Sequence, residues 1–251
     1  MRAWWTLVRR ELGSYFVSWT GYVIIGIVVF LLGLCFSLLL EALNGEKQEQ
    51  PLMELFQMSY YFWLILILSS PVITMRSFAH EKFTGTFETL MTTPVSDLQV
   101  VLAKFSSSMI FYLLTWIPLL GCVLVVRQFS DEPGALDVGT VGSTYLGIAL
   151  VGALYMSMGC FASSLTRSQI IAAMFSLAMG LSFFLFSFLS AVLAARSGWL
   201  SKLFAHLSLA DHMREFARGV VDLRPVVFYG SLTCLFLFLT LKAVESRRWK
   251  S

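Results

Sequence analysis

Charged residues are scarce in this sequence. Only 13% of its 251 residues are Asp, Glu, Lys or Arg, whereas 57% are hydrophobic, and the mean hydropathy is +0.77. A soluble globular domain has about 25% charged and about 45–50% apolar residues. The composition therefore excludes a soluble domain and predicts an integral membrane protein that consists mostly of membrane-spanning segments.

Motifs for nucleotide binding, metal binding and catalysis are also missing. The chain contains no Gly-Lys dipeptide, so it lacks the glycine-rich phosphate loop that binds ATP in many proteins. Its four cysteines form no Cys-x-x-Cys pair and lie within apolar runs, which indicates a packing role. His80-Glu81 begins like a zinc-protease motif, but Thr84 stands where the second histidine is needed. We expect no catalytic residue, metal site or cofactor in this chain.

Long apolar runs are abundant, and they predict the architecture. A helix needs about 20 residues to cross a bilayer. Six runs are long enough, and none has an ionisable residue in its interior: residues 19–40, 56–75, 105–126, 138–163, 168–195 and 226–241. We expect residues 1–251 to form a single all-α transmembrane domain with six spans. An ion-coupled carrier usually buries ionisable groups in its spans, so their absence argues against that class.

The first residues predict a helix that lies on the membrane surface. In residues 1–16, Trp4 and Trp5 are expected on one helical face and Arg9 and Arg10 on the opposite face. This arrangement is typical of a helix in the headgroup layer. More of the 18 Lys and Arg residues flank the spans on the N-terminal side than on the other side. Both termini are therefore predicted to be cytoplasmic.

A long segment before the last span is also amphipathic. Residues 196–225 contain two periodic stretches, and Ser208 can cap the second one, so we expect two short helices that dip into the outer leaflet. Their apolar residues are candidates for docking an accessory protein: Leu203, Phe204, Met213 and Phe216.

The polar segment 76–104 separates the second span from the third. Its periodicity predicts a helix from Arg76 to Met91, with Ala79, Phe83 and Phe87 on an apolar stripe and Glu81, Lys82, Gly85 and Glu88 opposite them. Pro94 ends that helix, since it lacks an N–H. Ser96 and Gln99 form a capping box for a second helix, which continues through Lys104 into the third span. A rigid elbow is therefore expected, although a plain interfacial connection has the same periodicity.

The elbow residues resemble a known signature. Glu81-Lys82-x-x-Gly85-Thr86-x-Glu88-x-Leu90, then Thr92-Thr93-Pro94-Val95-Ser96, with Lys104 where the next span begins, is similar to the signature of ABC-2 type permeases. The C-terminal stretch HMREFARGVVDLRPVVFYGSLTCLFLFLTLKAVESRRWK resembles the gliding-motility-associated, GldF-like branch. The resemblance covers essentially the whole chain.

This resemblance implies a fold, partners and a mechanism. It implies the six-span permease fold of type V exporters, with the elbow docked on a separate cytoplasmic ATPase that binds ATP and Mg²⁺ and is present in two copies. The implied coupling residues are Glu81, Lys82, Thr84, Gly85, Thr86, Glu88, Thr89 and Pro94. The N-terminal helix would brace the elbow. The implied setting is the bacterial inner membrane, with a second identical or different permease chain and no nucleic acid.

Two other functions stay open at this level. A non-transporting subunit could pass ATPase motion to a periplasmic or membrane-anchored accessory protein, as the gliding branch suggests. A secondary transporter or channel that works without ATP is the other alternative. The cargo is not evident from the residues.

Overall fold

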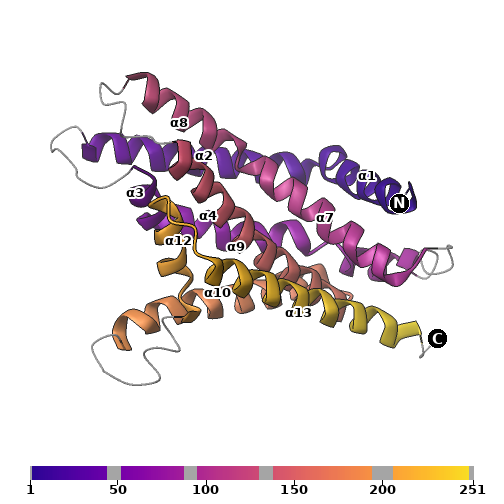
Figure 1. Cartoon of the computed structure of the whole chain (residues 1–251). Helices are drawn as coiled ribbons and strands as arrows, with labels where there is room; N and C mark the ends of the chain where they lie inside the picture. Colours follow the sequence, from indigo (N-terminus) through magenta and orange to yellow (C-terminus); the bar gives the residue numbers. More distant parts are fainter. Residues whose placement is uncertain (1, 44–51, 88–94, 130–137, 194–205, 249–251) are drawn as a thin grey trace.

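The described part of this computed structural model comprises residues 2–43, 52–87, 95–129, 138–193 and 206–248, and all its regular structure is helical. Six helical segments are long and apolar enough to cross a membrane: Trp19–Glu41, Tyr60–Thr84, Asp97–Gln128, Val138–Leu165, Gln169–Ser187 and Leu223–Ser246. The prediction of an all-α protein with six candidate spans is confirmed. Figure 1 shows these helices running side by side, with both chain ends at one end of the bundle.

The helices follow one another in a simple order. They are α1 (Arg2–Val17), α2 (Trp19–Leu43), α3 (Leu52–Met58), α4 (Tyr60–Thr74), α5 (Ala79–Thr84), α7 (Asp97–Thr115), α8 (Ile117–Phe129), α9 (Val138–Leu165), α10 (Gln169–Leu193), α12 (Leu209–Ala217) and α13 (Leu223–Arg248).

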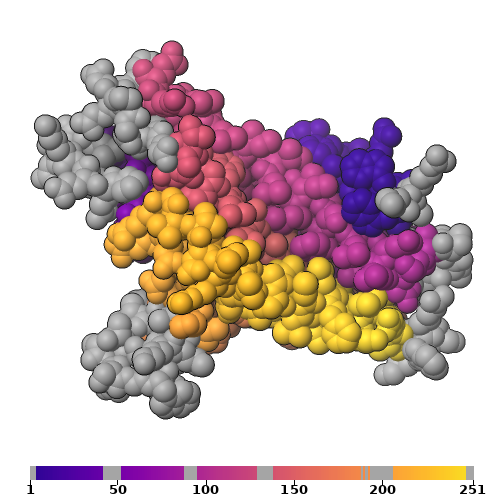
Figure 2. Space-filling view, in the orientation of Figure 1, coloured from indigo at the N-terminus to yellow at the C-terminus, as the bar shows by residue number. Residues whose placement is uncertain are grey.

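Helix α9 lies at the centre of the bundle and packs against α4, α7, α10, α12 and α13. Its glycines make these approaches close. A Cβ added at Gly152 would overlap the ring of Tyr112 on α7, and one at Gly159 would overlap the side chain of Thr74 on α4. Small residues let membrane helices approach in this way. The space-filling view in Figure 2 shows that α13 lies on the surface along much of the molecule.

The second and third predicted spans are each divided by a short break. Ser59 separates α3 from α4, and its hydroxyl accepts a hydrogen bond from the N–H of Phe62. Trp116 separates α7 from α8, where Pro118 has no N–H to donate to the preceding turn. The carbonyl of Trp116 accepts both the N–H of Leu119, at 3.1 Å, and the hydroxyl of Tyr145, at 2.8 Å. The predicted continuous helices 56–75 and 105–126 therefore need this correction.

Helix α1 packs along α7. Val8 is buried and Tyr15 stacks on Phe111 of α7, with ring centroids 4.7 Å apart. Trp5 is exposed, as are Arg9 and Arg10. Helix α1 thus uses Val8 and Tyr15 to pack on α7 and leaves Trp5 outside that contact, while its placement in the headgroup layer stays a prediction.

Candidate functional site

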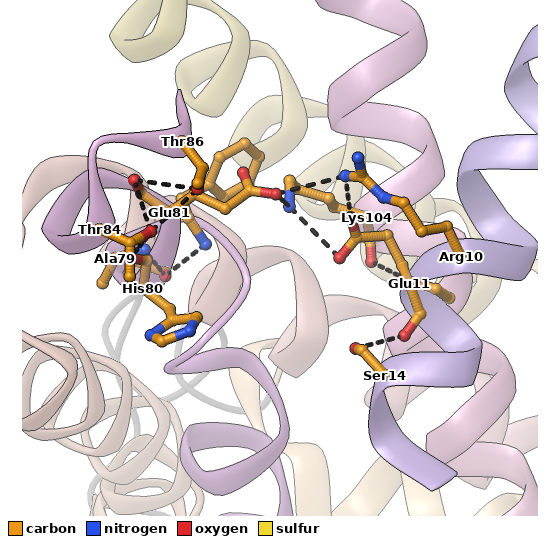
Figure 3. A network of polar contacts seen from close by, with 12 residues as sticks. Arg10, Glu11, Ser14, Ala79, His80, Glu81, Thr84, Thr86 and Lys104 are labelled. Atoms are coloured by element: carbon orange, nitrogen blue, oxygen red, sulfur yellow. Dashed lines mark hydrogen bonds and ion pairs between the residues drawn. The ribbon is translucent and has the colours of Figure 1, made fainter. Parts of the chain in front are cut away.

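Four charged side chains meet where α1, α5 and α7 converge (Figure 3). The Nζ of Lys104 on α7 lies 2.9 Å from Oε1 of Glu81 on α5 and 3.3 Å from Oε2 of Glu11 on α1. Nη2 of Arg10 lies 2.6 Å from Oε1 of Glu11 and 3.4 Å from Oε1 of Glu81. Two cations and two carboxylates thus join three helices in one ion cluster.

Burial makes this cluster more consequential than a surface ion pair. Lys104 is only 2% exposed, and its ammonium also lies 5.3 Å from the centroid of the Phe78 ring. Burial acts to raise the pKa of the Glu11 carboxyl, but Lys104 and Arg10 outweigh it and hold that pKa below its ordinary value. Removing one partner of such a cluster leaves a buried charge without compensation, which is strongly destabilising.

The start of α5 is fixed to the end of the central helix α9. The N-cap position, Phe78, supplies no side-chain cap. Ser163 of α9 takes that role, because its hydroxyl accepts the N–H groups of Phe78 and Ala79, each at 3.0 Å, and donates to the carbonyl of Met75. The start of α5 is therefore attached to the central helix of the bundle.

The side chain of Lys82 also points toward the bundle, at the end of α9. It is buried, its ammonium donates to the carbonyl of Ser164 on α9, and it lies 5.2 Å from the centroid of the Phe87 ring. The predicted polar face with Lys82 on it is wrong. The reason is that α5 packs against the end of α9, and this contact covers the side of α5 that carries Lys82.

The C-terminal end of α5, residues 83–86, is exposed, and we call it the tip. Gly85 ends α5 with φ +76°, a left-handed conformation that glycine adopts without a steric penalty. Thr84 and Thr86 flank it with their hydroxyls 2.9 Å apart, and both are exposed. Phe83 is 76% exposed, although the predicted stripe placed it with the buried Ala79 and Phe87. The tip thus presents an aromatic ring beside two hydroxyls and a bare backbone.

The other predicted coupling residues divide into two groups. Glu81 lies in the ion cluster and Lys82 is buried, so neither is presented at the tip. Glu88, Thr89 and Pro94 lie outside the described residues. The predicted capping box at the start of α7 is confirmed, since Ser96 and Gln99 each bond the other's backbone N–H. His80 contacts Gln169 of α10, with 3.0 Å between Nδ1 and Nε2.

A second charged contact lies at the opposite end of the bundle. Glu54 of α3 is 1% exposed, and Oε1 accepts hydrogen bonds from Nε of Arg214 and Nη2 of Arg218, each at 2.7 Å. Nε of Arg218 also donates to Oε2, at 2.9 Å. The hydrogen bonds from Arg218 and Arg214 outweigh burial and hold the pKa of Glu54 below its ordinary value. This clamp fastens α12 to α3.

Helix α12 is packed into the bundle instead of lying free in a leaflet. Met213 and Phe216 are buried, and both lie against Gly147 of α9, where an added Cβ would meet them at 2.9 Å. Ser208 caps α12 as predicted. The predicted docking role of Met213 and Phe216 conflicts with their burial, while Leu203 and Phe204 lie outside the described residues.

Sequence reasoning missed several residues that organise these sites. Glu11 and Glu54 were given no role, and Lys104 was identified only by its place before the third span. Arg214 and Arg218 are four residues apart on one helix, which is a signal for a shared partner, but nothing in the sequence indicates Glu54 as that partner.

A family model described as "ABC-2 family transporter protein" matches residues 43–241 of the chain, from the end of α2 into α13. The chain belongs to the ABC-2 transporter family. A search of curated proteins finds no match. Family membership makes the chain the permease component of an ABC transporter, a multi-pass membrane subunit of a kind that is generally non-catalytic and has an ABC ATPase as its general partner.

Proposed function

We propose that this ABC-2 permease couples ATP hydrolysis by a separate ATPase subunit to export across the bacterial inner membrane. Two ATPase copies, which bind ATP and Mg²⁺, would act on a pair of permease chains, and both termini of this chain would be cytoplasmic. The observation that carries the proposal is the elbow, which has an exposed tip and a base held by buried ion pairs.

The tip has the chemistry of a docking element. An exposed aromatic ring such as Phe83 loses water-contacting area when it enters a groove of a partner, and aromatic residues often anchor interfaces. Thr84, Gly85 and Thr86 would supply hydroxyls and open backbone beside it. We therefore assign docking to Phe83–Thr86 and assign Glu81 and Lys82 to holding the elbow in place.

The base of the elbow offers a route for force. Motion of the tip reaches α9 through Ser163, which binds the start of α5. It reaches α7 and α1 through Lys104 and Glu11. A rigid connection of this kind would move three helices together when the ATPase subunits close, whereas a loose linker would absorb the motion.

Export is favoured over a purely mechanical role for a structural reason. The mechanical alternative relied on an apolar docking surface for an accessory protein, and two of its four residues, Met213 and Phe216, are in the core. An accessory protein would need another surface.

The deciding experiment is co-purification of the ATPase from membranes. The double variant Phe83→Arg, Thr86→Arg should lose at least about tenfold of the bound ATPase, a loss of about 1.4 kcal/mol or more in binding. The matched control is Val220→Arg with Val221→Arg, two exposed positions next to α12. Each variant should elute as the wild type does in size-exclusion chromatography. Undiminished ATPase binding by the tip variant would contradict the proposal.

A further inference from the structure

A pocket of about 530 Å³ adjoins the ion cluster between α1, α2, α4 and α7. Polar groups line one part of it, including Arg10, Ser18, Thr20 and Arg76. Ile24 of α2 and Val72 of α4 line another part, within the predicted spans. The pocket therefore joins an apolar wall at membrane depth to a polar wall at the end of the spans.

The charges in this pocket do not balance. Three cations line it, Arg10, Lys104 and Arg76, against two carboxylates, Glu11 and Glu81. Arg10 and Lys104 are both paired with those carboxylates. In the part of the chain that the structure describes, Arg76 forms no ion pair, which leaves a net charge of one positive unit at Arg76.

Arg76 is held by hydroxyl groups. Its Nη1 donates to Oγ of Ser18, at 3.0 Å, and to Oγ1 of Thr20, at 2.8 Å. A guanidinium has five N–H donors in a planar fork, so two hydroxyl contacts through one nitrogen leave donors for a ligand. The hydroxyls of Ser18 and Thr20 also bond each other, so one of them donates to the other and one hydroxyl is left to donate to an anion. This set suits a phosphate group, which guanidinium binds with two parallel hydrogen bonds.

We propose that this pocket binds the phosphate group of a membrane phospholipid. Arg76 follows the end of α4 and Thr20 lies in the first turn of α2, which places both at headgroup level. Basic pockets between spanning helices commonly hold lipid headgroups. Ile24 and Val72 would contact the glycerol and first acyl carbons. That the pocket faces the inner leaflet rests on the proposed function, whereas phospholipid binding itself does not.

The test uses the full-length protein, purified in a non-ionic detergent, and native mass spectrometry. The probe is dioleoyl phosphatidylglycerol, and dioleoylglycerol, which has the same acyl chains without phosphate, is the matched probe. Wild-type protein should bind the phospholipid at least about tenfold more tightly than dioleoylglycerol. Arg76→Gln should remove most of this preference. Arg167→Gln, an exposed arginine outside the pocket with the same charge change, should keep it.

A second variant, a competition with inorganic phosphate and an ATPase-binding measurement complete the test. Thr20→Val keeps the arginine but removes one hydroxyl that contacts it, so it should weaken phospholipid binding severalfold even where Arg76→Gln fails to fold. Equal phospholipid binding by wild type and both variants would overturn the proposal, as would displacement of the lipid by millimolar inorganic phosphate, which would indicate a soluble ligand. Thr86 of the tip lines the pocket and Phe83 does not, so ATPase co-purification measured on the pocket variants and on Phe83→Arg alone distinguishes this failure from that of the proposed function.

Discussion

Lys104 and Glu81 form an ion pair, with 2.9 Å between Nζ and Oε1, across the connection that contains Pro94. The pair joins the elbow helix α5 to the helix that carries the chain back into the membrane. Because the same nitrogen lies 3.3 Å from Glu11, helix α1 is joined to both. The elbow is thus fixed at its base by charges from three separate helices.

The first prediction concerns the centre of this cluster. Lys104→Met should lower the free energy of unfolding by about 3 kcal/mol, because Glu81 and Glu11 then keep buried negative charge with only Arg10 nearby. Thermal unfolding in detergent, followed by tryptophan fluorescence, measures the loss.

A double variant provides the control for this prediction. Lys104→Met combined with Glu81→Gln removes the uncompensated carboxylate and should recover a large part of the stability, since Glu11 still has Arg10 at 2.6 Å. If the single and double variants are equally unstable, the loss comes from packing around Lys104 and the proposed electrostatic role is wrong.

The second prediction concerns the left-handed residue at the elbow tip. Gly85→Ala should destabilise the tip by about 1 kcal/mol, because φ +76° is costly for any residue with a Cβ. The space around Gly85 is open, so a steric clash is not the cause. Hydrogen exchange over residues 79–87 should quicken about fivefold. Gly121→Ala, in open space on α8 without positive φ, should show no such change.

The spans could be predicted because each is a run of apolar residues long enough to cross a bilayer. The breaks within them were missed, because a hydropathy profile does not register the side-chain cap at Ser59 or the missing N–H of Pro118 next to Trp116. The capping box at Ser96 was predictable because its two partners are only three residues apart.

The sequence predicted the faces of the elbow helix incorrectly. Periodicity assumes one continuous helix, and Gly85 breaks that assumption by ending α5 early. Phe83 is exposed and Lys82 is buried, the reverse of the prediction, because the packing of α5 on α9 decides which face is covered. The ion cluster was not predictable, because Glu11, Glu81 and Lys104 are brought together only by the packing of α1 and α5 on α7.

The third prediction is a pH dependence at the opposite end of the bundle. The pKa of Glu54 in the folded protein is below its ordinary value of 4.5. A depressed carboxyl pKa contributes stability above the unfolded-state pKa and loses it as the pH falls through the folded-state pKa. At pH 7, Glu54→Gln should cost about 2 kcal/mol, because it weakens the charge-assisted hydrogen bonds to two arginines that are themselves about half exposed. The difference in melting temperature between wild type and Glu54→Gln should shrink as the pH falls below about 4.5.

The titration of Glu11 does not distort that pH profile. Its pKa is also lowered, but it is present in both proteins, so its titration cancels in the difference. Arg218→Lys should produce an intermediate loss, because lysine cannot form the two-point contact that Arg218 makes with Glu54. A wild-type-minus-variant difference that stays constant from pH 7 to pH 3 would contradict the assignment of the clamp to an ionised Glu54.

The fourth prediction is the side of the membrane on which the elbow lies. Thr84→Cys and Thr86→Cys place thiols at exposed positions of the tip. In intact cells a membrane-impermeant maleimide should leave both thiols unmodified, and it should label both in inside-out vesicles, because a docking site for an ATPase must face the cytosol.

The unsubstituted protein, which has cysteines at 35, 122, 160 and 234, sets the background. A cysteine at exposed Val220, at the end of the bundle that carries α12, should show the opposite pattern. Labelling of the tip in intact cells would place it outside and exclude ATPase docking there.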